Sequence, residues 1–303
     1  MHIWHPEPGE ILLARTPVAF ATGAAMRVRG MRWFRDTERH DIQTELPGWP
    51  EGPVHVVRGG GNAAARNVVK GGLIALGVVI MGILSSQGGS VGPGASDQGS
   101  DTPDDRADEV EDFPVMWAAP GTLARTLPWQ LDPGRTDRKR YTTHAILTDR
   151  RLVIVGLPVH KDIAIIDDEM LWEIPRSSIG TVEPRDFKDG TDVKITFTDG
   201  SWCRLWARGR PRLTRYLVGP GEVIPLESLN AAQQKTAQDF AAAQASDAGP
   251  PVVTRNTCGC YLITVVAPSG TRSFFGTSEL TSVMDADGTT LPYKQYHPED
   301  FTS

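Results

Sequence analysis

The side chains best suited to acid–base chemistry in this sequence lie around one predicted hairpin. His144 and His160 flank that hairpin. A histidine beside a carboxylate can act as a general base, because the carboxylate orients the imidazole and stabilises its charged form. Both residue types are also common in surface turns, so a hydrolase of unknown type that uses either histidine is an alternative function and not the main expectation. The nearby carboxylates are Asp149, Asp162, Asp167 and Asp168.

The sequence lacks the short motifs that identify common enzyme classes. It has no G-x-S-x-G nucleophile elbow, no P-loop, no dinucleotide-binding glycine fingerprint and no H-E-x-x-H zinc motif. We therefore expect a protein without enzymatic activity and without a cofactor.

The three cysteines do not form a disulfide framework or a recognisable metal site. Cys258 and Cys260 are separated by a single glycine, and Cys203 lies far from them in the sequence. Two thiols at this spacing, with no further cysteine or nearby histidine, make a poor zinc site. We expect free thiols in strands and no bound metal. One disulfide is the alternative if this part of the chain is extracellular.

Two groups of basic residues are the candidate binding sites. Arginine suits phosphate and other anions because its planar fork donates two parallel hydrogen bonds. Each group could instead be a solvated face, or could be masked by an acidic stretch of the same chain. The first group is Arg135, Arg138, Lys139, Arg140, Arg150 and Arg151, and the second is Arg204, Arg208, Arg210, Arg212 and Arg215.

The charge of the chain is negative overall and unevenly distributed. The 303 residues carry a formal net charge of −6, and acidic side chains are concentrated in residues 97–112. This acidity does not favour nucleic-acid binding, so no nucleic-acid partner is expected.

The longest uncharged apolar stretch, GGLIALGVVIMGIL, covers residues 71–84 and has basic residues before it and acidic residues after it. A helix needs about 20 mostly apolar residues to cross a bilayer, and residues 68–84 reach the lower limit of that length. We expect a single transmembrane helix within residues 63–86 of a cell-membrane protein. Because basic residues near a span tend to stay in the cytoplasm, the N-terminus is expected there. The alternative is a core or oligomerisation helix, residues 68–84, in a soluble protein.

Residues 87–112 are rich in glycine, serine, proline and aspartate and contain almost nothing to bury. Such a composition cannot offset the conformational entropy of ordering, so a disordered linker is expected. The predicted organisation is a small N-terminal segment (1–62), the span (63–86), the linker (87–112), a β domain (113–220) and a helix followed by a hairpin region (221–303).

Short β-rich runs separated by turns dominate the chain after the linker. Residues 144–156 are predicted to form a hairpin, and the next expected strands are 171–175 and 179–182. The run DVKITF alternates apolar and polar residues and leads through T-D-G-S into WCRLWA, which predicts a second hairpin. Helices are expected at 211–218 and 226–245, and a further hairpin at 252–276.

The order of LTDRRLVIVG, WEIPRSSIGTVEP and DVKITFTDGSWCRLW resembles bacterial PH-like and GRAM-like domains. The resemblance covers about residues 141–218. It implies a small, strongly bent antiparallel barrel closed by a C-terminal helix, for which residues 211–218 are the candidate. The fold class is therefore expected to be mainly β with some α, namely a PH-like barrel with one transmembrane helix and a disordered acidic linker. The residues that carry the resemblance are Thr148 and Arg151, Ile174 and Pro175 with Ile179, and Asp199 with Gly200.

Taken together, these features predict a non-enzymatic, membrane-anchored binding or adaptor protein that presents a PH-like domain. The expected partners are the membrane through residues 68–84 and another protein, with an anionic lipid surface as a further candidate. A soluble PH-like binding module is the first alternative, and the hydrolase is the second.

Overall fold

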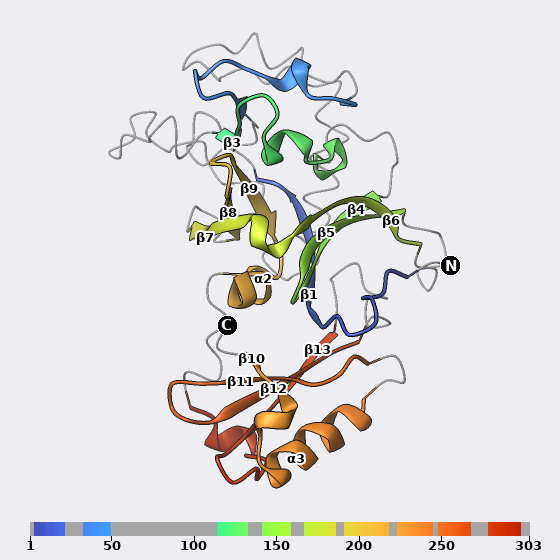
Figure 1. Cartoon of the computed structure of the whole chain (residues 1–303), viewed down its shortest axis with the longest axis vertical. Helices are drawn as coiled ribbons and strands as arrows, with labels where there is room; N and C mark the ends of the chain where they lie inside the picture. The colour runs from blue at the N-terminus through green and yellow to red at the C-terminus, as the bar shows by residue number, and fades with distance from the viewer. Residues whose placement is uncertain are drawn as a thin grey trace, which may run out of the picture.

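Two β-sheets account for most of the regular structure of this mainly β chain, and helices are few and short (Figure 1). The computed structural model describes residues 3–21, 33–49, 114–132, 141–158, 167–185, 191–217, 223–244, 248–267 and 278–297.

The larger sheet has nine strands and is curled like half a barrel (Figure 1). Its main path runs β2-β3-β9-β1-β4-β5-β6, and β8 joins β9 to β7. All its pairings are antiparallel except that of β2 with β3. The strands are β1 (Leu12–Phe20), β2 (Trp33–Arg35), β3 (Pro114–Trp117), β4 (Tyr141–Thr148), β5 (Arg151–Pro158), β6 (Glu169–Pro175), β7 (Ile179–Arg185), β8 (Asp192–Phe197) and β9 (Trp202–Ala207).

Strand β5 is apolar on both faces because both faces of the sheet are covered at this point. Leu152 and Ile154 belong to the main core on the inside of the curl. Val153 and Val155 point to the other face, where they belong to a second cluster with Trp4. An uninterrupted apolar run, instead of strict alternation, is typical of a strand buried on both sides.

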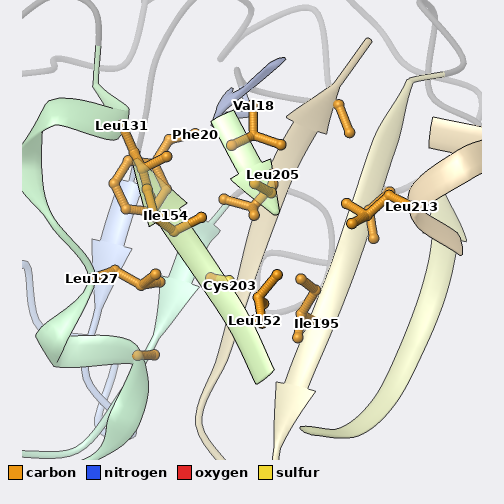
Figure 2. Packing of buried hydrophobic residues seen from close by; sticks show 14 of the residues in the cluster. Val18, Phe20, Leu127, Leu131, Leu152, Ile154, Ile195, Cys203, Leu205 and Leu213 are labelled. Carbon is orange, nitrogen blue, oxygen red and sulfur yellow. The ribbon is translucent and has the colours of Figure 1, made fainter. Parts of the chain in front are cut away.

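The main core fills the inside of the curl (Figure 2). Leu127 follows one short helical turn directly, Leu131 ends another, and α2 supplies Leu213. These side chains pack on Phe20 and Leu205 from β1 and β9. The helical segments of this part are η2 (Gln43–Glu45), η3 (Leu123–Thr126), η4 (Trp129–Leu131), η5 (Arg176–Ser178) and α2 (Arg210–Leu217).

The second sheet has four antiparallel strands in the order β10-β11-β12-β13. Ile263 and Met284 face α3, where they pack with Ala237. Asn230 caps α3 by accepting from the backbone N–H of Gln233, whose side chain accepts from the backbone N–H of Asn230 in return. The elements are β10 (Val223–Ile224), η6 (Leu226–Ser228), α3 (Ala231–Ala242), β11 (Val252–Arg255), β12 (Tyr261–Ala267), β13 (Ser278–Met284) and η8 (Tyr293–Gln295).

The two sheets are in direct contact. Val266 of β12 packs into the outer cluster of the nine-stranded sheet, and Val252 of β11 joins the main core. Arg215 of α2 also forms an ion pair with Glu279 of β13 at 3.1 Å. The second sheet therefore contacts both the outer cluster and the main core of the first.

The predicted single-pass membrane location is corrected by the structure. No helix in the described ranges is long and apolar enough to cross a membrane. The longest of them, α3, has 12 residues and is rich in alanine and glutamine. At 1.5 Å per residue it is about 18 Å long, whereas the hydrocarbon core is about 30 Å thick. The expected span (63–86) and linker (87–112) both lie outside the described residues.

The predicted small closed barrel is also wrong, because the sheet is larger and open. Residues 12–20 form β1, which lies between β4 and β9 in the centre of the sheet. Strands β6 and β7 follow one another in the chain and are joined by η5. They nevertheless form two separate edges of the sheet. The result is half a barrel and not a closed one.

Most individual elements agree with the sequence-based predictions. The hairpins of β4 with β5 and of β8 with β9 are confirmed, and so are α2 and the main part of the predicted second helix. In the C-terminal region β12 pairs with β13 at residues 278–284, which the sequence did not indicate as a strand. The predicted strand at 272–276 lies outside the described residues.

Candidate functional site

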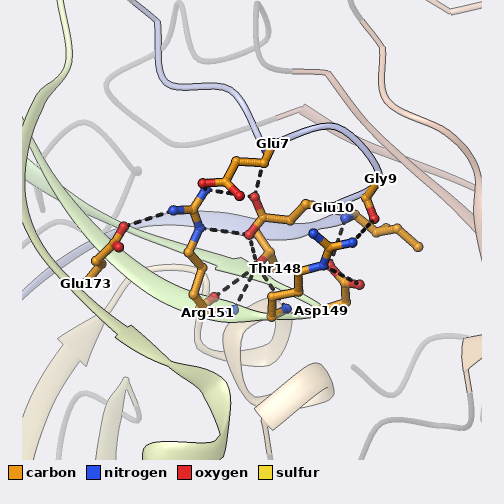
Figure 3. A network of polar contacts seen from close by, with 9 residues as sticks. Glu7, Gly9, Glu10, Thr148, Asp149, Arg151 and Glu173 are labelled. Carbon is orange, nitrogen blue, oxygen red and sulfur yellow. Dashed lines mark hydrogen bonds and ion pairs between the residues drawn. The ribbon is translucent and has the colours of Figure 1, made fainter.

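Arg150 and Arg151, from the first predicted binding group, bind the N-terminal segment (Figure 3). Arg151 donates from Nε and Nη2 to the two carboxylate oxygens of Glu10, at 2.9 Å each. Its Nη1 lies 3.0 Å from Glu173, and Arg150 donates to the carbonyl of Gly9 at 2.7 Å. Both guanidinium groups are therefore engaged in contacts with other parts of the same chain. Arg135, Arg138, Lys139 and Arg140 lie outside the described residues.

The second predicted group is not brought together as one surface. Arg204 is fully buried on β9, with Nη1 3.6 Å from Asp192. Arg210 donates to the carbonyl of Arg185, and Arg215 pairs with Glu279 between the two sheets. Burial lowers the pKa of Arg208 from its ordinary value, and the side chain of Arg212 is not among those described.

His144 is sealed inside the protein, beside a buried ion pair. Its side chain is 0% exposed, and its Nδ1 accepts from Nε of Arg15 at 3.2 Å. Arg15 in turn donates to both oxygens of Asp168, at 2.7 and 2.8 Å. Burial, together with the charge of Arg15, lowers the pKa of His144 well below its ordinary value. A base without access to solvent cannot reach a substrate, so this geometry favours a structural role. His160 and Asp162 lie outside the described residues.

The structure does bring together one set of side chains with recognisable ligand chemistry: Cys258, Cys260 and His297. Cys258 and Cys260 lie in the loop that joins β11 to β12. The backbone N–H of Gly259 donates to the carbonyl of Asn256, and the N–H of Asn256 donates to the carbonyl of Cys260. Gly259 has φ +92°, which an L residue adopts only with strain. A glycine between the two cysteines is what lets the chain turn so that both thiols belong to one loop.

His297 reaches this loop from the far side of β13. The segment after β13 turns back along the sheet, since Leu291 donates its N–H to the carbonyl of Val283. Tyr296 then fixes the end of the segment, because its hydroxyl accepts from the N–H of Val283 at 3.2 Å and its ring packs on Leu262 and Val283. The next residue is His297, whose Nδ1 lies 3.5 Å from Sγ of Cys260.

The separation of Cys260 and His297 suits two ligands of one tetrahedral metal ion. One ligand atom from each of the three side chains lies within 4.8 Å of the other two. Zinc binds sulfur at about 2.3 Å and imidazole nitrogen at about 2.0–2.1 Å, so tetrahedral S and N ligands are about 3.6 Å apart. The observed separation of 3.5 Å between Cys260 and His297 agrees with this value. None of the three cysteines of the chain forms a disulfide.

The cluster lies between an apolar interior and solvent. Cys260 is 7% exposed and packs with Leu262 and Val283, whereas Cys258 is half-buried and His297 is exposed. An ion held here would be shielded on one side and accessible on the other.

A second set of potential ligands, Asp36, Glu38 and His40, lacks this character. Glu38 and His40 are exposed, and the carboxylate of Asp36 already accepts from the backbone N–H groups of both residues, at 2.9 and 2.8 Å. These hydrogen bonds close a turn. The closeness of these three side chains is therefore explained by the local turn.

No protein-family model matches this chain, and no curated protein and no solved structure matches it. The predicted membership of the PH-like and GRAM-like families is therefore corrected, and with it the adaptor role that was inferred from those families. The motif around Thr148 and Arg151 has a local explanation instead. The Thr148 hydroxyl accepts from the backbone N–H groups of Arg150 and Arg151 and closes the turn, while Arg151 binds Glu10.

The sequence did not indicate that His297 lies beside the two cysteines. His297 lies far from the two cysteines in the sequence, whereas zinc motifs are recognised by short spacings between their ligands. Recognising β13 as a strand antiparallel to β12 would have brought the residues after β13 back toward the loop before β12. The hairpin turn C-G-C with a single later histidine was the available signal.

Proposed function

We propose that this chain is a non-enzymatic binding protein whose C-terminal unit holds a transition-metal ion, with Zn²⁺ favoured, through Cys258, Cys260 and His297. The observation that carries the proposal is the convergence of two thiols and one imidazole within 4.8 Å. Thiolate and imidazole are the preferred ligands of zinc, whereas calcium and magnesium take oxygen ligands. The protein partner and the anionic surface expected from the sequence remain predictions.

Titration with Zn²⁺ in competition with a chromophoric chelator tests the proposal. The full chain should take up one ion, and Cys258→Ser, Cys260→Ser and His297→Ala should each weaken binding by orders of magnitude. Binding should also release protons, because each thiol must become a thiolate.

Two matched variants control for indirect effects. Cys203→Ala removes the one cysteine that lies in the other sheet, and His5→Ala removes an exposed histidine far from the cluster in the chain. Both should bind zinc like the natural chain. Unchanged zinc affinity in the three ligand variants would overturn the proposal.

A cysteine nucleophile activated by histidine is the second candidate, and the 3.5 Å separation of Cys260 and His297 favours it. It corresponds to the hydrolase alternative, with a different pair of residues. In that case one thiol should react with iodoacetamide much faster than the other, and Cys260→Ser alone should abolish ester hydrolysis while Cys258→Ser retains it. Protection of both thiols by one equivalent of zinc would support the metal site instead.

A further inference from the structure

We propose that Cys258 and Cys260 form a redox-active pair, which a peroxide converts from two thiols into one disulfide within the loop. The inference goes beyond the proposed function, because the metal-free chain should undergo the same reaction. Where an ion is bound, the reaction removes two of its ligands. The inference rests on the separation of the two sulfur atoms, on the turn between them and on the unequal exposure of the two side chains.

The two sulfur atoms lie close enough to bond after a small rearrangement. Sγ of Cys258 and Sγ of Cys260 are at most 4.8 Å apart. A disulfide bond is about 2.05 Å long, so the gap to be closed is less than about 3 Å, which is the distance a sulfur atom moves on a change of χ1 rotamer. Neither sulfur belongs to a disulfide in the structure, which therefore shows the pair in its reduced form.

The turn between the two cysteines brings their backbones into range of each other. Along an extended strand, Cα atoms two residues apart are separated by about 6.7 Å, close to the upper limit of about 6.8 Å for a disulfide. Here the chain turns instead, since Gly259 has φ +92° and the backbone N–H of Asn256 donates to the carbonyl of Cys260 at 2.9 Å. The turn shortens the separation, so the disulfide fits within the loop.

The exposure of the cysteines assigns their order of reaction. Cys258 is half-buried, whereas Cys260 is 7% exposed. A small oxidant such as a peroxide therefore meets Cys258 first, and Cys260 then resolves the oxidised sulfur. Cys203 is fully buried in the core of the nine-stranded sheet, where burial raises the pKa of its thiol, so it should take no part.

The reaction is balanced with hydrogen peroxide as the oxidant. The thiol of Cys258 loses its proton to solvent, and its sulfur attacks one peroxide oxygen. The O–O bond breaks, Cys258 becomes a sulfenic acid, and the departing hydroxide takes up a proton to give water. The sulfur of Cys260 then attacks the sulfur of Cys258, the S–O bond breaks, and the hydroxyl leaves with the proton of Cys260 as a second water. The two thiols are oxidised by two electrons, and the peroxide is reduced by two.

Oxidation of the EDTA-treated full chain with one equivalent of hydrogen peroxide tests the inference. Remaining thiols are labelled with N-ethylmaleimide in denaturant, and trypsin then separates residues 256–272, which hold Cys258 and Cys260, from residues 195–204, which hold Cys203. Labelled thiols should fall from three per chain to one. The 256–272 peptide should lose two hydrogen atoms and take no label, whereas the 195–204 peptide should stay labelled. Dithiothreitol added before labelling should restore all three.

Single-cysteine variants test the two steps separately. Cys260→Ser should leave the sulfenic acid on Cys258 unresolved, so that dimedone captures it. Absence of this adduct would overturn the inference. Cys203→Ala is the matched control, because it removes a cysteine but keeps the pair, and it should form the disulfide as the natural chain does.

The outcomes separate this inference from the proposed function. If zinc binds through these thiols but the EDTA-treated chain keeps three labelled thiols, or links its cysteines only between chains on a non-reducing gel, the metal site stands and the inference is overturned. If the disulfide forms within the 256–272 peptide but the reduced chain binds no zinc, the inference stands and the proposed function is wrong.

Discussion

At the scale of single residues, the main polar feature on the outer face of the nine-stranded sheet is the buried ion pair of Arg15 with Asp168. Both side chains are 1% exposed, and Asp168 also accepts from the backbone N–H of Trp4 at 2.7 Å. A buried charge without its partner costs about 3–5 kcal/mol. His144 adjoins this pair and is held as a neutral imidazole, with Nε2 buried and without a hydrogen-bond partner.

His144 should make the protein less stable at mildly acidic pH. Its pKa in the folded protein lies well below the ordinary value of 6.5, so the unfolded chain takes up a proton first as pH falls. The contribution of His144 to stability is therefore fully present above about pH 7, and it is lost as pH falls below about 6.5, by roughly 1 kcal/mol at pH 5.5. Urea unfolding at pH 7.5 and 5.5 measures the difference.

His144→Gln is the control for this pH effect, because glutamine can accept from Arg15 but does not titrate. The loss of stability between pH 7.5 and 5.5 should be smaller in the variant by the same amount, roughly 1 kcal/mol. An equal loss in both proteins would show that other groups cause it.

Glu10 and Glu7 bind the same guanidinium and provide a matched comparison of buried and exposed carboxylates. Glu10 is 5% exposed, and although burial opposes its ionisation, hydrogen bonds from Arg151 and Thr148 lower its pKa. Glu7, which is exposed, lies 3.2 Å from Arg151. We expect Glu10→Gln to cost about 2 kcal/mol and Glu7→Gln less than about 0.5 kcal/mol in urea unfolding. Equal effects would contradict the network described here.

At the scale of elements, the turn after β13 is fitted to the start of α3. The carbonyl of Ala286 accepts from the side chains of Asn230 and Gln233, and Thr236 donates to the carbonyl of Gly288. Gly288 has φ +87°, and a Cβ there would lie 2.6 Å from the backbone nitrogen of Gln233. The close approach of turn and helix therefore depends on this glycine.

Gly288→Ala should destabilise the C-terminal unit by about 3 kcal/mol, since it adds a clash with the helix backbone to the cost of the left-handed conformation. Gly200→Ala is the matched control. Gly200 has φ +83° but open space around its Cβ position, so only the conformational cost of about 1 kcal/mol applies. Thermal unfolding followed by circular dichroism compares them, and an equal loss in both variants would contradict the close packing.

The strands that could be predicted are those with a strong local pattern. β8 and β9 were predicted with their observed bounds, since apolar and polar residues alternate on both sides of a T-D-G-S turn. β13, with the sequence SELTSVM, was missed because it has few apolar residues. Missing β13 also hid the placement of His297, so the candidate site could not be assembled from the sequence.

At the scale of the whole molecule, sequence patterns could not show which distant segments pair. The centre of the larger sheet combines β1 with β4 and β9, which are far away in the chain. These pairings depend on long-range packing and not on local propensity. A family resemblance carried by three short motifs predicted a smaller, closed barrel for the same reason: the motifs describe hairpins, which many β folds share.

The contact between the two sheets should couple metal binding to the stability of the whole chain. All eight tryptophans lie in residues 4–206, so tryptophan fluorescence reports on the larger unit alone, whereas the metal site lies in the other. Zinc at about 1,000 times its dissociation constant stabilises the folded state by about 4 kcal/mol. We expect the urea midpoint from tryptophan fluorescence to rise with zinc.

Replacing a residue of the interface should weaken this coupling. Glu279→Gln removes the carboxylate charge that pairs with Arg215 across the two units, while the metal ligands remain intact. In this variant the fluorescence midpoint should respond less to zinc. The contrary result is a fluorescence midpoint of the natural chain that does not change with zinc, while circular dichroism detects a zinc-dependent transition. That result would show that the two units unfold independently.

The zinc K-edge X-ray absorption spectrum of the zinc-loaded full chain tests the central claim most directly. The account predicts two sulfur neighbours at about 2.3 Å and an imidazole nitrogen at about 2.0–2.1 Å, with the sulfur signal reduced to one neighbour in Cys258→Ser. A spectrum with only nitrogen and oxygen neighbours, or one unchanged in Cys258→Ser, would contradict the assignment of Cys258, Cys260 and His297 as a metal centre.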